Sequence, residues 1–162
     1  MEWLGVIGGR NKRNFILSIR QVIGGIPFDG TERFWLTPPS VYEPLHAEFG
    51  FDFDPCPCPK PEGYDSLHIA WGRMSYVNPP FRPHDGVNGK GPTAFVRKAI
   101  QESKEGRGSV LLIPTQSYVN LLLEAGAESR SMGRVRWLEA STGVAMTGPS
   151  PITAFILRGS EK

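Results

Sequence analysis

Apolar residues recur at intervals of three or four positions in three segments of the chain, which is the period of one helix face. In the first segment Val41, Leu45 and Phe49 follow Ser40, whose hydroxyl can cap a helix, and precede Gly50, which can end one. The pattern predicts helices over residues 40–49, between Thr93 and Gly106, and over about 117–125, the last with Val119, Leu122 and Leu123 on its apolar face.

Short apolar runs between these segments predict strands. Residues 51–54 and 75–78 are each followed by proline, which ends strand pairing. Residues 109–113 run apolar without alternation, as a strand covered on both faces does. Two later runs, residues 134–138 and 152–157, are joined by a connection rich in Gly, Thr, Ser and Pro that suits an antiparallel pair. We therefore expect an α/β protein whose sheet is mixed and has an antiparallel C-terminal edge.

The strand–helix–strand order in the middle of the chain predicts where a ligand would bind. Parallel strands joined by right-handed crossovers send their carboxyl ends to one side, and open α/β sheets bind ligands there. Asp54, Asn78 and Pro114 each come at the end of a predicted strand. We expect all three to lie around one site.

The chain is long enough for one domain, with 162 residues of which 40% are apolar. Its net charge of +2 excludes a histone-like polycation and an acidic tail protein. The excess lies in residues 1–30, where Arg10, Lys12, Arg13 and Arg20 stand against Glu2 and Asp29. We predict a basic N-terminal arm over residues 1–30 and one domain over residues 31–162. The arm either contacts nucleic acid or has no function.

We expect neither a secretion signal nor a membrane span. Nothing before Arg10 resembles a signal peptide, and the longest strongly apolar run, residues 110–113, is far shorter than the roughly 18 residues that a span requires. Cys56 and Cys58 lie two positions apart between prolines, where a disulfide would be strained, which favours a reducing cytoplasm. The same spacing differs from that of zinc ligands, so we predict no metal.

The strongest candidate for chemistry is Asn78-Pro79-Pro80-Phe81, directly after the strand. The exocyclic amine of a nucleobase is a poor nucleophile because its lone pair is delocalised into the ring. The Asn78 side-chain oxygen and the Pro79 carbonyl can accept its two hydrogens and free that lone pair, while the two prolines fix the carbonyl's direction. Phe81 offers a flat face to an unstacked base. The motif predicts a clamp for the amine of a flipped base, although prolines after a strand also form ordinary turns.

Signatures of other chemistries do not occur in the sequence, which contains no G-x-S-x-G elbow, P-loop or G-x-G-x-x-G fingerprint. This disfavours hydrolysis by a serine triad and the use of nucleoside triphosphates. Methyl transfer from a sulfonium needs neither a metal nor a covalent nucleophile, because the enzyme mainly aligns the two reactants. The clamp therefore favours methyl transfer.

Several segments occur in a specific order: residues 34–39, 48–54, 65–67 with 71–72, 78–81, 108–114, 133–137 and 149–152. In these the chain resembles the phage-type DNA adenine N6-methyltransferases, S-adenosylmethionine-dependent enzymes of phages and prophages. The resemblance covers nearly everything from Phe34 to Arg158. It implies a Rossmann-like methyltransferase fold, double-stranded DNA as partner, and action in the cytoplasm of a bacterial host.

The resemblance also assigns roles by position. It implies that Thr37 and Pro38 lie near the methionine part of the donor, and that Asp65 lies near its ribose or adenine, although Asp65 can equally be a surface turn residue. The full set of donor-binding residues that it implies is Trp35, Thr37, Pro38, Asp54, Pro55 and Asp65. The proline-rich loop 55–59 departs from the glycine-rich turn that most methyltransferases carry, so a rigid loop would have to approach the donor.

The polar, glycine-rich residues 82–92 follow the clamp and predict a loop that closes on DNA, with Arg82 and Lys90 against phosphates. An ordinary solvated loop is the alternative. The same clamp serves cytosine N4 and, in related enzymes, a glutamine side-chain nitrogen, so these are alternative targets. A nucleic-acid-binding module without catalysis is the alternative from another class. A monomer and a dimer are both compatible with the sequence.

Overall fold

The computed structural model describes residues 35–58, 60–80, 91–114, 118–140, 142–148 and 150–160. The predicted arm over residues 1–30 lies outside these ranges, as do three of the predicted site residues, Phe81, Arg82 and Lys90.

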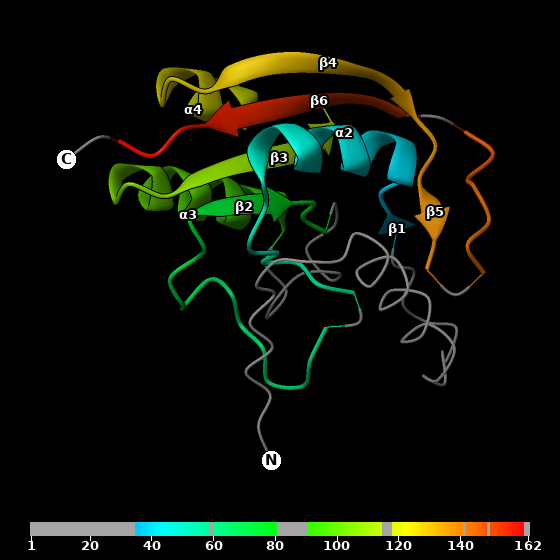
Figure 1. The fold of residues 1–162 in the computed structure, drawn as a ribbon, viewed down its shortest axis with the longest axis horizontal. Helices are drawn as coiled ribbons and strands as arrows, with labels where there is room; N and C mark the ends of the chain where they lie inside the picture. Colours follow the sequence, from blue (N-terminus) through cyan, green and yellow to red (C-terminus); the bar gives the residue numbers. More distant parts are fainter. Residues whose placement is uncertain are drawn as a thin grey trace.

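A four-stranded mixed sheet forms the centre of the described chain, in the order β2-β3-β6-β4 (Figure 1). β2 (Met74–Val77) and β3 (Gly108–Pro114) are parallel. β6 (Ser150–Leu157) runs antiparallel to β3 on one side and to β4 (Glu128–Val135) on the other. The chain is therefore an α/β protein with a mixed sheet, and the predicted antiparallel pair at one edge is confirmed.

Helices cover both faces of this sheet. α3 (Pro92–Lys104) joins β2 to the parallel β3, so the predicted strand–helix–strand unit is confirmed. α3 packs on the face that carries Leu111 and Ile113, while α2 (Pro39–Phe49) packs on the face that carries Val110 and Leu112. Because successive side chains of a strand point to opposite faces, covering both faces buries the whole apolar run of β3.

α2 shows how the local pattern produces an element. Leu45 is buried against the sheet, and Val41 and Phe49 pack beside it, as the four-residue spacing predicts. Gly50 ends the helix at φ 64°, a conformation that suits glycine, and its N–H bonds to the His46 carbonyl. The cap predicted at Ser40 is wrong. The N-cap position is Pro38, and the following proline starts the helix without losing an intrahelical hydrogen bond.

Two other predictions need correction. α4 (Val119–Glu124) is a short helix that buries Leu122, whereas Leu123 is 49% exposed and does not belong to the apolar face. The strand predicted at residues 134–138 is divided: β4 begins at Glu128, and Leu138 belongs to β5 (Leu138–Glu139). β4 lies at the edge of the sheet and is mostly exposed, so its residues lack the apolar run that marks a buried strand.

β5 pairs antiparallel with β1 (Trp35–Leu36) in a second sheet of two strands. β1 contains Trp35, the first of the residues predicted to bind the methyl donor. Among the helices that the structure describes, none combines the length and the apolar character that crossing a bilayer requires.

Candidate active site

The ends of the three strand segments at Asp54, Asn78 and Pro114 lie at the same edge of the sheet. Phe53 forms a parallel bridge with Ser75, flanked by a 3.0 Å bond from the Asp52 N–H to the Met74 carbonyl and a 2.9 Å bond from the Tyr76 N–H to the Phe53 carbonyl. The chain at residues 51–54 therefore runs parallel beside β2, although it pairs through a single bridge. Asp54, Asn78 and Pro114 consequently come at the carboxyl ends of three parallel segments, as the sequence predicts.

The segment after β1 reaches this edge and meets Asn78. The Asn78 side-chain Nδ2 donates a hydrogen bond of 3.2 Å to the Trp35 carbonyl. Thr37 comes two residues after Trp35, and Tyr76 comes two residues before Asn78. The hydroxyl groups of Thr37 and Tyr76 are bonded to each other. Trp35 and Thr37, which the resemblance assigns to the donor, thus lie against the strand that presents the clamp. Pro38 follows Thr37 and is the N-cap residue of α2.

The bond to Trp35 determines which way the Asn78 amide faces. With Nδ2 directed at a carbonyl, the Oδ1 atom occupies the other position of the amide, and no donor within the described part of the chain is bonded to it. Pro79, next along the chain, is buried, and Pro80 is half-buried. The side chain therefore keeps a hydrogen-bond acceptor available directly beside the fixed backbone of the prolines.

Asp54 has an unusual electrostatic environment. Burial raises the pKa of Asp54 from 3.8 to about 7, although the Cys56 N–H, 2.8 Å from Oδ1, partly opposes this. The charge of Asp54 in turn adds to the effect of burial in raising the pKa of Tyr42 and Tyr64, each to about 12. Aromatic hydroxyls and thiols thus surround a carboxyl group that gains or loses its proton near neutral pH.

The proline-rich loop continues from Asp54 and is tied to the next loop. Pro55 is buried, and its carbonyl accepts a 2.6 Å hydrogen bond from the Ser66 hydroxyl. Cys56 and Cys58 are free thiols, and burial raises the pKa of the Cys58 thiol to about 11. Both are neutral at pH 7 because the pKa of Cys56 is also raised by burial. Over the ranges that the structure describes, no group of three or more His, Cys, Asp and Glu residues could hold a metal ion.

Asp65 belongs to a turn and is engaged there. Its carboxylate accepts a 3.1 Å bond from the Leu67 N–H and lies 2.8 Å from His68 Nδ1. The adjacent Ser66 joins this turn to Pro55, so Asp65 is connected to the loop that follows Asp54 through one intervening residue. These contacts support the turn interpretation of Asp65.

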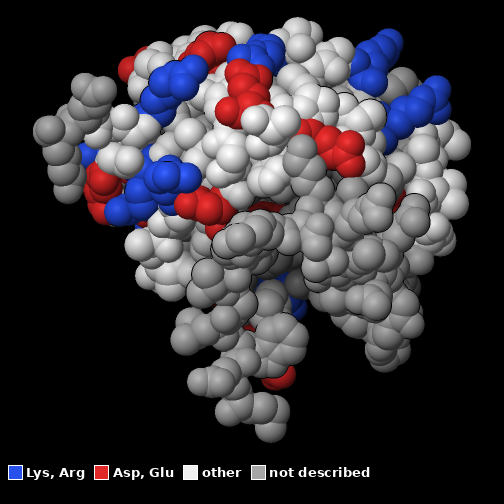
Figure 2. Space-filling view, viewed as in Figure 1, with Lys and Arg blue, Asp and Glu red and all other residues white. Residues whose placement is uncertain are grey.

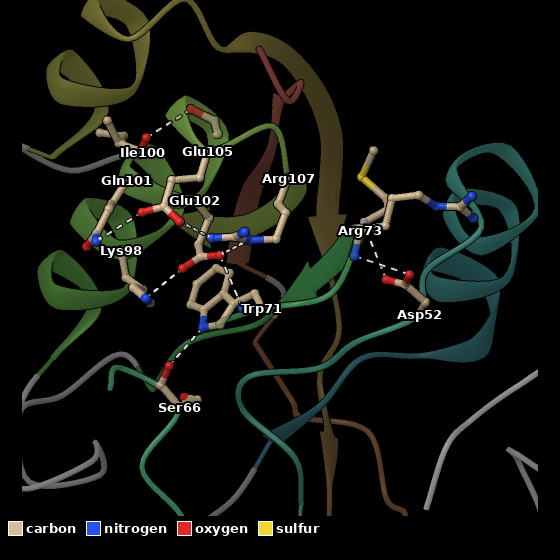
Figure 3. A network of polar contacts seen from close by, with 12 residues as sticks. Asp52, Ser66, Trp71, Arg73, Lys98, Ile100, Gln101, Glu102, Glu105 and Arg107 are labelled. Atoms are coloured by element: carbon tan, nitrogen blue, oxygen red, sulfur yellow. Dashed lines mark hydrogen bonds and ion pairs between the residues drawn. The ribbon is translucent and has the colours of Figure 1, made fainter. Parts of the chain in front are cut away.

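Figure 3 shows a buried carboxylate, that of Glu102, among polar contacts that reach Trp71 and Ser66. Glu102 of α3 is 1% exposed and binds Lys98 at 2.6 Å, the Arg107 guanidinium, and the Trp71 N–H at 3.1 Å. The Trp71 ring nitrogen donates a 2.8 Å bond to the Ser66 carbonyl. Burial alone would raise the pKa of Glu102, but the bonds from Arg107, Lys98 and Trp71 outweigh it and lower the pKa. A continuous set of polar contacts therefore runs from α3 to the loop at Pro55.

Charge does not mark a nucleic-acid interface on the face shown in Figure 2, where basic and acidic side chains are interspersed. Arg130 illustrates this, because its guanidinium makes bonds of 2.7 and 3.0 Å to Glu48 and one of 3.3 Å to Glu128. The predicted phosphate contacts, Arg82 and Lys90, and the stacking residue Phe81 lie outside the described residues.

Two residues that contribute to this site were not predicted from the sequence. Tyr76 occupies an apolar strand position that is typical of the core, and its hydroxyl contact becomes visible only when Thr37 is placed. Its alternation with Asn78 was the available signal, because residues two apart on a strand point to the same face. Ser66 carries no chemical signature, and its contact with Pro55 depends on the folding of two loops.

Comparisons of this chain with protein-family models, with curated proteins and with solved structures find no match.

Proposed function

We propose that this chain is an S-adenosylmethionine-dependent methyltransferase, with a Rossmann-like domain over residues 31–162, that methylates the N6 amine of adenine in double-stranded DNA. One observation carries the proposal. Asn78 stands at the carboxyl end of a parallel strand, its Nδ2 donates to the Trp35 carbonyl, and no donor among the described residues is bonded to its Oδ1. The order of segments that resembles the phage-type family supports the choice of substrate, the host cytoplasm and the phage or prophage origin.

The chain's own residues supply the activation of the amine. Asn78 Oδ1 and the Pro79 carbonyl accept one hydrogen each, which draws the amine nitrogen toward tetrahedral geometry and frees its lone pair. The nitrogen gains a bond to the methyl carbon as the bond from that carbon to sulfur breaks, and the nitrogen then loses one proton to water. Phe81 stacks on the extruded base, and Arg82 and Lys90 bind phosphates. When bound, S-adenosylmethionine supplies an electrophilic methyl group on a sulfonium.

The electrostatics of Asp54 fit such a donor. Asp54 is half-buried, and no cation among the described residues lowers the pKa of its carboxyl group, which burial raises to about 7. A ligand that brings hydroxyl donors and positive charge would stabilise the ionised form. Asp54, Pro55, Thr37, Pro38, Trp35 and Asp65 would hold the donor.

The test is to incubate the purified full chain with labelled S-adenosylmethionine and duplex DNA, digest the DNA to nucleosides, and identify the modified nucleoside by mass. We expect N6-methyladenine. If only cytosine carries the label, the target base is cytosine and not adenine. If the chain binds DNA without labelling it, the result supports a non-catalytic binding module.

Asn78→Ala should lower the transfer rate by about 10²-fold or more, the usual effect of removing one positioned group that stabilises a transition state. Asn120→Ala is the matched control, because Asn120 is an exposed asparagine on α4, and it should leave the rate unchanged. Calorimetry should show that Asn78→Ala binds S-adenosylmethionine with nearly the original affinity. Full activity of Asn78→Ala would remove this residue from the mechanism.

A further inference from the structure

Two neighbouring side chains, one on β2 and one directly after it, make hydrogen bonds to the same distant segment. Tyr76 lies on β2 and packs on the face that α2 covers, and Asn78 follows Val77, the last residue of the strand. Tyr76 bonds to Thr37, and Asn78 bonds to Trp35. The order is reversed, since Asn78, the later of the two residues, bonds to Trp35, the earlier residue of the distant segment. The two contacts together define one register between the strand end and residues 35–37.

The Tyr76 contact is held rigidly. Tyr76 is 5% exposed, its ring lies edge-on to Tyr42 at 4.9 Å between centroids, and the Phe51 ring lies 5.3 Å away. Burial raises the pKa of Tyr76 well above its ordinary value, so its hydroxyl keeps its proton at neutral pH. A ring fixed on two sides places the hydroxyl at one point, and Thr37 is bonded there.

The Asn78 contact is held less firmly. It is a single neutral hydrogen bond of 3.2 Å, and its acceptor lies on a strand whose ladder with β5 is two residues long. An asparagine amide can rotate so that its oxygen and its nitrogen exchange places. The flipped orientation would direct Oδ1 at the Trp35 carbonyl oxygen and the Nδ2 hydrogens at the amine of the base, which is itself a donor. The acceptor orientation of Asn78 therefore depends on where the segment at residues 35–37 is placed.

We propose that Tyr76, acting through Thr37, is a positioning residue that holds the Trp35 carbonyl where it orients the Asn78 amide with its oxygen toward the reacting amine. The catalytic consequence rests on the proposed methyl transfer. The orientation of the Asn78 amide does not depend on methyl transfer, because it is a property of the protein without a ligand.

The first experiment reads the amide directly. Solvent exchange of the Asn78 side-chain NH₂ protons is measured by NMR in the ¹⁵N-labelled full chain, with the resonances assigned by their loss in Asn78→Asp. Tyr76→Phe, which keeps the ring, and Thr37→Val, which keeps the shape, should each speed exchange about tenfold, as expected for the loss of one partly buried hydrogen bond. The double variant should show no further change. Thr37→Ser retains the hydroxyl and should retain the slow exchange.

The second experiment reads the chemistry. Tyr76→Phe should lower kcat about tenfold while KM for S-adenosylmethionine changes less, since the group affected faces the amine. Unchanged amide exchange in both Tyr76→Phe and Thr37→Val would overturn the positioning role whatever the activity. Faster exchange with an unchanged kcat would overturn its catalytic consequence. Absence of any methyl transfer by the unsubstituted chain would overturn the proposed function, and the exchange data would still decide whether Tyr76 orients Asn78.

Discussion

Two carboxyl groups, the buried Glu102 on α3 and the half-buried Asp54 at the end of the first parallel segment, have opposite surroundings. Glu102 is bonded to Lys98, Arg107 and the Trp71 N–H, and these contacts lower its pKa. Asp54 receives the Cys56 N–H, and burial raises its pKa to about 7. Glu102 therefore has cationic partners within the fold, whereas no cation among the described residues lowers the pKa of Asp54.

The comparison also separates support from chemistry. The contacts of Glu102 continue through Trp71 and Ser66 to the carbonyl of Pro55. The proline-rich loop after Asp54 is therefore held from the α3 side of the sheet.

The largest effect is expected from removing the satisfied carboxylate. Glu102→Ala should lower the free energy of unfolding by about 3 kcal/mol or more, because Lys98 and Arg107 lose their partner and the buried Trp71 N–H loses its acceptor. Urea denaturation followed by tryptophan fluorescence measures this. Glu105→Ala is the control, since Glu105 is exposed and binds the same Arg107, and it should leave the midpoint nearly unchanged. Equal effects of the two substitutions would contradict the distinction between Glu102 and the surface.

Asp54→Asn should affect ligand binding and not the stability of the fold. It removes a charge that has no cationic partner among the described residues, so the stability of the protein without ligand should not fall. Affinity for S-adenosylmethionine should fall about tenfold, as expected when a charge-assisted hydrogen bond becomes a neutral one. Calorimetric titration measures the affinity, with the exposed Glu43→Gln as the control. A large loss of stability with unchanged donor affinity would show that Asp54 is a structural residue.

The smallest effect is the dependence of stability on pH. Because the pKa of Asp54 is raised from 3.8 to about 7 by burial, folding is favoured by this group below about pH 4, and the contribution is lost as the pH rises toward 7. The pKa of Glu102 is lowered, so its contribution is present above its ordinary 4.5 and is lost at lower pH. Asp54→Asn should therefore flatten the decline across this range, by well under the about 1.4 kcal/mol per pH unit that one fully coupled proton gives, because Asp54 is only half-buried.

Urea midpoints measured for Asp54→Asn and for the unsubstituted chain at several pH values between 4 and 7 decide this point. If the two curves run parallel, the Asp54 carboxyl group is solvated and the contrast with Glu102 disappears.

Elements with a strong local pattern were predicted well. The spacing of Val41, Leu45 and Phe49 predicted α2, because a buried stripe needs an apolar residue in each turn of the helix. Gly50 correctly marked the end of the helix. The continuous apolar run of β3 predicted its burial on both faces. The prediction failed where burial is slight. Leu123 lies on a short exposed helix, and β4 begins six residues before its predicted start because an edge strand exposes one of its faces.

The candidate site divides in the same way. Local chemistry was sufficient to predict that Asn78 follows a strand and that two prolines stiffen the chain after it, because both depend on neighbouring residues. The contacts of Asn78 with Trp35 and of Tyr76 with Thr37 join positions 43 and 39 residues apart, and the opposite states of Asp54 and Glu102 depend on which loops cover them. Hydrogen-bond direction and burial act over a few ångströms in space, so only the folded chain decides them.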